Sequence, residues 1–449
     1  MLWKNWRGKL LLVFGSGGLG LLVMLSLELT LGPGRIEEVL LDWRYRYMNA
    51  GLAPDPRVVV VRFDGGPYRE ALAGASTATL HADDLLQVVD SILLFRPRAI
   101  LMEGLPELPA GLAETLADIA SGSSRLSLPV WTDKPLQMDS VRAFQAAEDP
   151  ALEDAHRVTE IVALQVIRTD AHPESTVYAL HALRHPGLVP LQAARALHIV
   201  SLPLDLDAVA RRAPLLFRLE GGNYLPGPGL RALWLDGRVD SVVLEADSLT
   251  LVSPQRTRET LSHEDGAMRI HYYPPRAYLP ARRGSDVTRF RIFSGVEVRE
   301  SLDLLQNRQV FRFEELPVLP DEFENVFVIV DLASPTLDTP IGPLPRSYVQ
   351  ATVLSNLLQG HHLKEVGALW GWLLACLTAW SIGGFVVLGR SGVTRAILPL
   401  FISVFPLLAG AVAFSYRIGL PLSQHLVATV ATLSFVFPLR RFLSKPDTR

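Results

Sequence analysis

The chain has 449 residues, of which 49% are hydrophobic, and a formal net charge of −3 at pH 7. This near-neutral charge argues against a nucleic-acid-binding protein, which would need a basic surface. The single cysteine, Cys376, excludes an intramolecular disulfide framework.

The first apolar run covers residues 10–31, after a short N-terminal segment, residues 1–9. A helix needs about 20 mostly apolar residues to cross a bilayer, and this run is long enough. The alternative is a cleavable signal peptide, whose apolar core is typically about 7–15 residues long. We favour a retained anchor, because the run is longer and no small-residue cleavage site follows it. Within it, the glycine-rich segment 15–20 is expected to let another helix approach closely.

Residues 32–364 have the pattern of one large soluble domain. RVVVVRFD and ENVFVIVD are typical of strands buried on both faces. An amphipathic helix over 81–95 joins the first of these to a second apolar strand, which indicates a parallel β–α–β unit. We therefore predict an α/β fold with a mixed, partly parallel sheet flanked by helices. The predicted strands cover 57–64, 96–104, 159–167, 213–221, 266–273 and 324–331.

The helix predicted from SYVQATVLSNLLQGHHL ends near Gly360 and leads into three more apolar runs. These runs cover 366–388, 396–414 and 425–439, and the last is short for a span. With 10–31 they predict four transmembrane helices in a 1+3 arrangement. The tail, 440–449, completes the chain.

Lysine and arginine residues flank the predicted spans unevenly. They precede the first span, lie in the loop GRSGVTR and follow the last span, whereas the opposite hairpin, YRIGLPLSQ, has one arginine. By the positive-inside rule, both termini are cytoplasmic and residues 32–364 face outward.

Seven segments occur in an order that is similar to one known family. They are LLDWRYRY (40–47), VVVVRFD (58–64), LLFRPRAILMEG (93–104), LDLDAVARRAPLLF (204–217), MRIHYYPP (268–275), DTPIG (338–342) and VQATVLSNLLQG (349–360). Together with the 1+3 spans they resemble the type-2 CHASE domain, an extracellular sensory module associated with bacterial cyclases and histidine kinases.

The resemblance implies a periplasm-facing receptor in the bacterial inner membrane. Relatives signal through a cytoplasmic nucleotide cyclase, histidine kinase or Ser/Thr kinase. Only about ten residues follow Leu439 in this sequence, so we expect the effector to be a separate polypeptide. Three positions depart from the family pattern. Glu103 replaces an Asp, Ala208 replaces a Gly, and Val330–Asp331 stand where a Gly is usual.

The candidate ligand-binding residues are Asp64, Glu103, Asp331, Thr339 and Arg211. The three acids end predicted strands, where α/β sheets bind ligands, and together could hold a hard cation or an amine. The alternative, which we favour, is that each caps a helix or satisfies its own loop. Neither a bound metal nor a cofactor is predicted.

Three further groups have ordinary explanations. Arg211 and Arg212 follow Asp205 and Asp207, so they would bind an anion or, as we favour, form an internal ion-pair turn. His181 and His185 have metal-compatible spacing, and His361–His362 could titrate near neutral pH. We favour a solvated face for the first pair and interfacial residues for the second.

The sequence contains no G-x-S-x-G, Walker A or H-E-x-x-H motif, so we predict a protein that is not an enzyme. The leading hypothesis is a sensor with four kinds of partner: the lipid bilayer, a periplasmic ligand, a separate cytoplasmic or membrane effector, and further copies in a homo-oligomer. No nucleic acid is expected. The alternatives are a structural or assembly factor of the cell envelope and, with little support, an outward-facing hydrolase or transferase.

Overall fold

The computed structural model divides the chain into two compact units. The α/β unit is Ala50–His362, and the helical unit combines Met1–Asn49 with Leu363–Arg449. The sequence-based boundary at residue 32 differs, because the segment up to Asn49 groups with the helices. The structure describes residues 2–31, 35–48, 52–63, 78–103, 110–131, 165–168, 178–180, 188–205, 207–219, 224–244, 248–255, 258–262, 267–279, 289–295, 297–299, 301, 318, 320–331, 334–366, 368–388 and 392–443.

A six-stranded sheet forms the centre of the α/β unit, and each pair of neighbouring strands is parallel. Because the strands are parallel, their carboxyl ends meet at one edge. In spatial order they are β14 (Arg291–Ser294), β1 (Val58–Arg62), β15 (Phe327–Asp331), β2 (Ala99–Glu103), β3 (Leu126–Val130) and β6 (Leu197–Ile199).

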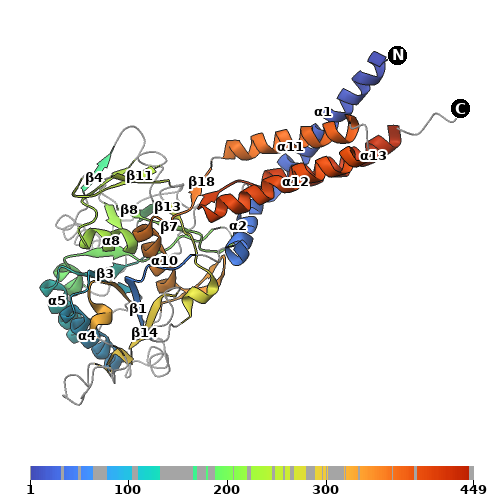
Figure 1. Cartoon of the computed structure of the whole chain (residues 1–449). Helices are drawn as coiled ribbons and strands as arrows, with labels where there is room; N and C mark the ends of the chain where they lie inside the picture. Colours follow the sequence, from blue (N-terminus) through green and yellow to red (C-terminus); the bar gives the residue numbers. More distant parts are fainter. Residues whose placement is uncertain are drawn as a thin grey trace. The chain divides into compact units, whose positions relative to one another are not determined.

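Helices cover both faces of this sheet (Figure 1). On one face lie α4 (Ala78–Leu94) and α5 (Ala110–Gly122), with which the apolar side chains of alternate strand positions form a continuous core. On the other lie α8 (Pro228–Leu235), against β2 and β6, and α10 (Arg346–Gln359), against β1 and β15. Burial on both faces explains why the strands contain so many valines, isoleucines and leucines.

Smaller sheets surround the central one. The largest is mixed, with the order β12-β11-β10-β4, and only its β10–β4 pair is parallel. The other elements that the structure describes in this unit are β4 (Gln165–Arg168), β5 (Tyr178–Leu180), α7 (Leu188–Ala193), β7 (Arg212–Pro214), β8 (Leu216–Leu219), β9 (Tyr224–Pro226), β10 (Ser241–Leu244), β11 (Ser248–Val252), β12 (Arg258–Ser262), β13 (Ala267–Arg269), η2 (Pro275–Tyr278), η4 (Pro320–Phe323), β16 (Thr336–Thr339) and β17 (Gly342–Pro345).

The α/β class, the parallel relation of β1 and β2 and the helix ending at Gly360 are confirmed. Gly360 has a φ of 61°, the left-handed conformation typical of a helix C-terminus. Two details of the prediction were wrong. The central sheet is parallel rather than mixed, and the strand predicted over 213–221 is two strands separated at Leu215.

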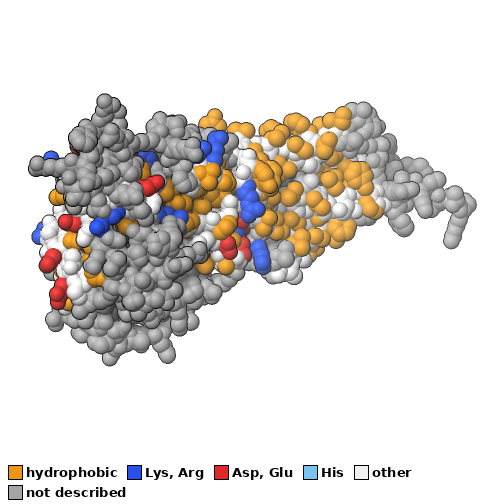
Figure 2. All heavy atoms as spheres, turned by 90° about the horizontal axis from the view of Figure 1, so that it is seen from below, with side chains coloured by type: hydrophobic (Ala, Val, Ile, Leu, Met, Phe, Trp, Pro, Cys, Tyr) orange, Lys and Arg blue, Asp and Glu red, His pale blue; other side chains and the backbone are white. Residues whose placement is uncertain are grey.

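The helical unit contains five described helices: α1 (Leu2–Leu31), α2 (Arg35–Met48), α11 (Ala368–Leu388), α12 (Gly392–Ser415) and α13 (Ser423–Leu443). The short strand β18 (Lys364–Glu365) precedes α11. It pairs in parallel with β19 (Ile418–Gly419), which lies between α12 and α13. Hydrophobic side chains cover much of the visible face of these helices (Figure 2).

Two described helices contain stretches long and apolar enough to cross a membrane, Leu369–Leu388 and Ile397–Phe414. A shorter apolar stretch lies in α1, over Val13–Leu27. The predicted count of four long apolar spans was therefore wrong by this measure. The beginning of α13 contains Ser423, Gln424 and His425, which lower its hydropathy.

The glycine-rich segment of α1 is a helix-packing surface, as predicted. A side chain at Gly17 would lie 2.7 Å from the Trp380 ring on α11, and one at Gly20 would overlap Thr432 on α13. Glycine at these two positions therefore allows both helices to pack closely against α1.

Candidate functional site

Three charged residues end three adjacent strands of the parallel sheet, β1, β15 and β2. In the register of β1, β15 and β2, Arg62 is opposite Asp331, and Asp331 is opposite Glu103. Because side chains alternate along a strand, all three project to the face covered by α10. The sheet thus places the acidic residue Asp331 between the basic residue Arg62 and the second acidic residue, Glu103.

Asp331 is fully buried and accepts hydrogen bonds from several neighbours. The backbone N–H of Ser334 donates to Oδ1 at 2.8 Å, and the Ser334 hydroxyl donates to Oδ2 at 3.0 Å. The hydroxyl of Ser347, in the first turn of α10, donates to Oδ2 at 2.6 Å. Arg62 Nε lies 3.4 Å from the same oxygen. Asp331 therefore holds both its own loop and the beginning of α10.

Glu103 is also buried and forms an ion pair with Arg346, the first residue of α10. The pKa of Glu103 is nevertheless raised to about 7, mainly by burial and also by the neighbouring charge of Asp331, against the opposing effect of Arg346. Burial likewise raises the pKa of Asp331, while its hydrogen bonds from Ser347 and Ser334 lower it. Glu103 can thus gain or lose a proton near neutral pH.

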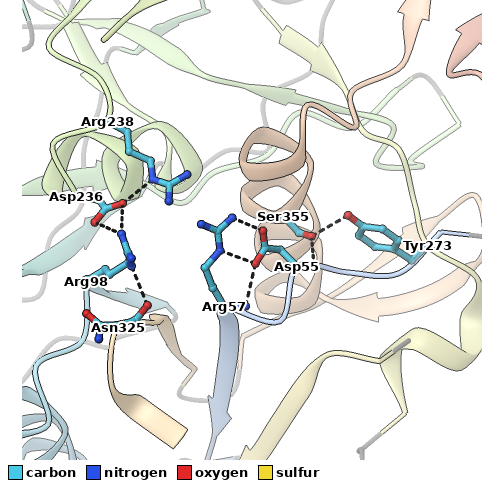
Figure 3. A network of polar contacts seen from close by, with 8 residues as sticks. All are labelled: Asp55, Arg57, Arg98, Asp236, Arg238, Tyr273, Asn325 and Ser355. Atoms are coloured by element: carbon cyan, nitrogen blue, oxygen red, sulfur yellow. Dashed lines mark hydrogen bonds and ion pairs between the residues drawn. The ribbon is translucent and has the colours of Figure 1, made fainter. Parts of the chain in front are cut away.

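The other end of α10 is held at the opposite edge of the sheet (Figure 3). The hydroxyl of Ser355 accepts a hydrogen bond from the Asp55 backbone N–H at 2.7 Å and is 2.7 Å from the Tyr273 hydroxyl. Asp55 in turn accepts two hydrogen bonds from the guanidinium of Arg57, at 2.9 and 2.6 Å. Polar contacts therefore tie both ends of this helix to the sheet or its flanking segments.

The same figure shows how α8 ends at this edge. Asp236, the C-terminal cap of α8, accepts hydrogen bonds from Arg98 and Arg238. Arg98 also donates to the backbone oxygen of Asn325 at 2.8 Å. These contacts join α8 to the start of β2 and to the turn before β15.

Aromatic residues cover the middle of α10. The ring of Tyr278 stacks on Tyr348 with centroids 6.3 Å apart, and its hydroxyl is 2.9 Å from the Thr352 hydroxyl. The Arg62 guanidinium lies over the other ring of this pair, Tyr348, at 4.9 Å. Tyr278 belongs to the segment after MRIHYYPP, so this part of the sequence supports α10.

Arg211 lies in an internal ion-pair turn, as the favoured interpretation predicted. It contacts Asp205 at 3.0 Å and Asp207 at 2.7 Å, while Arg212 contacts Asp205 at 2.7 Å. The hydrogen bond from Arg211 lowers the pKa of Asp207. Ala208, in the same turn, has a φ of 63°, which explains why glycine suits this position.

The remaining candidates do not join the acids in any described contact. The buried Thr339 hydroxyl donates to the Gly342 carbonyl and closes the β16–β17 hairpin. Asp64 lies outside the described residues, as do His181 and His185. Of the five candidates, the structure brings together Glu103 and Asp331.

The comparison with protein families fits this arrangement. A profile for the CHASE2 domain matches residues 18–389, which is most of the chain. The chain belongs to the CHASE2 family. Searches of curated proteins and of solved structures each found no match.

The CHASE2 chain has a second buried polar group that the sequence did not reveal. His198 on β6 is 2.8 Å from the Ser127 hydroxyl through Nδ1 and 3.1 Å from the Met102 carbonyl through Nε2. The pKa of His198 is lowered to about 3, mainly by burial and also by the charge of Arg231. Although Ser127 and His198 resemble a nucleophile–base pair, both side chains are fully buried.

Arg231, on α8, is fully buried. Its Nε donates to the Leu197 carbonyl at 2.7 Å, and its guanidinium lies 4.4 Å from the Trp234 ring centroid. Its Nη1 and Nη2 make no hydrogen bond among the described residues. Burial accordingly lowers the pKa of Arg231 to about 9.

Among the described residues, no group of three His, Cys, Asp or Glu side chains could hold a metal ion. A groove of about 860 Å³ lies on the other face of the sheet, between α4 and α5. Its lining includes Leu86, Asp90, Leu94, Thr115, Asp118 and Arg125. It does not include the acid pair.

One signal for the missed residues was present in the sequence. Arg62 follows four valines in a buried strand, and His198 lies in the apolar segment ALHIV. A charged or polar side chain in such a strand requires a partner. The partners of Arg62, Asp331 and Tyr348, lie more than 200 residues further along the chain, and their pairing with Arg62 could not be identified from the pattern.

Proposed function

We propose that this CHASE2 protein is a bacterial inner-membrane sensor whose α/β unit faces the periplasm. The unit would detect an extracytoplasmic ligand or cell-envelope component. The membrane helices would relay the resulting change to an effector on a separate polypeptide. The protein would act without catalysing a reaction, either alone or as a homo-oligomer.

The observation that carries this proposal is the position of α10. Its first two residues, Arg346 and Ser347, contact the acid pair at the carboxyl ends of the parallel strands. In open α/β sheets, ligands generally bind at these ends. Its last residue, Gln359, is only nine positions before the start of α11. A change at the acids therefore acts on a helix that leads directly along the chain into an apolar helix.

A ligand would act by competing for contacts that α10 now makes. A cation or amine drawn to Glu103 and Asp331 would replace Arg346 or the Ser347 hydroxyl at the carboxylates. Asp64, Thr339 and Arg211 remain proposed contributors to ligand binding. The ligand shifts the equilibrium only by the difference in its affinity for the two arrangements of α10.

We further propose that α11 and α12 cross the membrane and that α1 and α13, which lack an apolar stretch of that length among the described residues, cross with them in the 1+3 order. The two long apolar stretches support crossing by α11 and α12. The close packing of α1 on α11 and α13 supports including the other two helices. The arginines of GRSGVTR, those at the end of α13 (Arg440 and Arg441) and Arg449 favour a cytoplasmic location for those regions.

The relay is tested by isolating tagged full-length protein from cross-linked membranes. A cytoplasmic partner is expected to co-purify with the wild-type protein. The Ser347→Ala substitution is expected to change the amount of this partner several-fold. Asp338→Ala, which changes an exposed acid of β16, is the matched control and should leave recovery unchanged. Repeated recovery of no partner, or equal recovery with Ser347→Ala, would count against the relay.

A structural or assembly factor of the cell envelope is the second candidate. It is favoured by the fact that Glu103, Asp331 and Arg211 already have partners within the chain. This candidate predicts the same protease digestion pattern before and after exposure to periplasmic extract. A pattern that changes in wild type but not in Ser347→Ala would instead favour the sensor.

A further inference from the structure

The helix α2 has one face packed on the helical bundle. Leu41, Arg44 and Tyr45 are buried. The Arg44 guanidinium donates to the Leu420 carbonyl at 3.2 Å, and the ring of Tyr45 meets that of Phe414 at 5.2 Å. These contacts place α2 at the end of the bundle where α12 ends and α13 begins.

A hydrogen bond from α13 fixes the first turn of α2 at the same end. The backbone N–H of Ser423, the first residue of α13, donates to Glu37 Oε2 at 2.7 Å. Glu37 also forms an ion pair with Arg44 at 3.3 Å. Both ends of the buried face are thus held, which fixes the rotation of α2 about its axis.

The opposite face of α2 presents a strip of large side chains. Val39 is 61% exposed, Trp43 50% and Tyr47 69%, and they recur every four residues. The rings of Trp43 and Tyr47 are 5.5 Å apart. At about 100° per residue, the exposed Arg35 and Arg46 project within about 40° of Val39, so arginines border the strip.

A strip of this composition fits a lipid surface. Tryptophan and tyrosine have an apolar body and a polar atom, which suits them to the boundary between headgroups and acyl chains. Arginines at its border match lipid phosphates. The neighbouring α12 also exposes apolar side chains, among them Phe401, Phe405, Leu408 and Val412.

A second copy of the chain is a weaker match for this strip. Three side chains of this size and exposure present on the order of 300–400 Å². A stable protein interface needs about 800 Å² from each partner. The strip alone is therefore too small for a dimer, whereas a bilayer surface imposes no such minimum.

We propose that α2 is an interfacial helix whose strip, Val39, Trp43 and Tyr47, binds the headgroup–acyl boundary of the outer leaflet. This inference rests on the proposed crossing of the membrane by α11 and α12. It assigns α2 to the membrane surface rather than to the sensory domain, so the chain lies along the bilayer before it enters the α/β unit.

The test uses full-length protein in liposomes containing phosphatidylcholine brominated at a shallow or a deep acyl position. In a Cys376→Ala background, Tyr47→Cys is labelled with bimane and its quenching is measured. Leu408→Cys is the control for lipid contact on α12. Leu94→Cys, at 75% exposure, is the matched control for exposure in the α/β unit.

Shallow bromines are expected to quench the label at position 47 at least twofold more than deep ones. The label at 408 should be quenched and that at 94 should not. If the label at position 47 is unquenched, like the label at 94, while the label at 408 is quenched, the interfacial assignment is overturned and the membrane anchor remains supported. No quenching at 408 would instead contradict the anchor itself. Protection of 47 from both lipid bromines and aqueous iodide would indicate a second copy and also overturn the proposal.

Discussion

The two faces of the central sheet are built from the same strands but differ in chemistry. Toward α4 and α5, side chains such as Val59, Ile100 and Val328 form an uninterrupted apolar core. Toward α8 and α10, the same strands present charged or polar residues, among them Arg62, Glu103 and Asp331. Burial is similar on both faces, so only the second face has to satisfy its buried groups by specific contacts.

This difference separates stability from regulation. An apolar face tolerates small movements of its helices, because dispersion and burial are not directional. A face held by Asp331 and Glu103 has a small number of defined contacts that a proton or ligand can change. The polar face is therefore where a change in solution can become a change in helix position.

The largest effect is expected from Asp331→Ala. The change leaves the Ser347 hydroxyl and Arg62 without their buried acceptor, so it should lower the free energy of unfolding by about 4 kcal/mol. Denaturant unfolding of the intact protein measures this loss. Asp338→Ala should lose less than about 0.5 kcal/mol, and an equal loss in both variants would contradict the role of the buried contacts.

On the apolar face, Ile100→Ala should lower the free energy of unfolding by about 3 kcal/mol through lost burial and a cavity. The loss should be the same at pH 5 and pH 8, because no titrating group is removed. Leu94→Ala, at 75% exposure, is the control. A pH-dependent loss for Ile100→Ala would show that the two faces do not act independently.

Glu103→Gln should change how stability depends on pH. Since burial raises the pKa of Glu103 from its usual value of 4.5 to about 7, the folded protein binds this proton more tightly than the unfolded chain. The resulting stabilisation is fully present below about pH 4.5 and is lost as the pH rises through 7. Between pH 5 and 8 the loss is on the order of 2–3 kcal/mol.

The difference between wild type and Glu103→Gln across this pH range isolates the contribution of Glu103, because other groups titrate in both proteins. A constant difference from pH 5 to 8 would mean that the carboxyl is not shifted. Parallel curves for Ile100→Ala and wild type are the internal control.

The smallest effect is expected from Arg231→Met. The buried Nη1 and Nη2 of Arg231 make no hydrogen bond among the described residues, so removing the charge should leave stability unchanged or raise it by about 1 kcal/mol. Arg211→Met, which removes an equally buried but paired guanidinium, should lower it. A loss of comparable size for Arg231→Met would show that an acceptor satisfies this side chain in solution.

The sequence predicted the elements whose pattern is local. Four valines specified β1, and the apolar periodicity with Gly360 specified α10. The strands β3, β6 and β14 were missed. The strand β6 has only three residues, and β3 and β14 include residues such as Pro129 and Ser294 that are uncommon in strands. Their place in the sheet depends on tertiary contacts rather than on intrinsic preference.

Part of the candidate site was also predictable from local sequence patterns. Asp331 and Glu103 could be placed together, because parallel strands bring their carboxyl ends to one edge. Their partners Arg346, Ser347 and Arg62 depend on which strand lies beside which, and β15 lies between β1 and β2 although it follows them by more than 200 residues. That order cannot be derived from periodicity.

The short pairing of β18 with β19 has a mechanical consequence. The Lys364 backbone N–H donates to the Arg417 carbonyl at 2.8 Å, and that of Val366 to the Gly419 carbonyl at 3.1 Å. The segment entering α11 is thereby coupled to the hairpin between α12 and α13. A pull on α11 along its axis would also load the other two helices, so any displacement would be transmitted as a shared tension in three helices rather than the sliding of one.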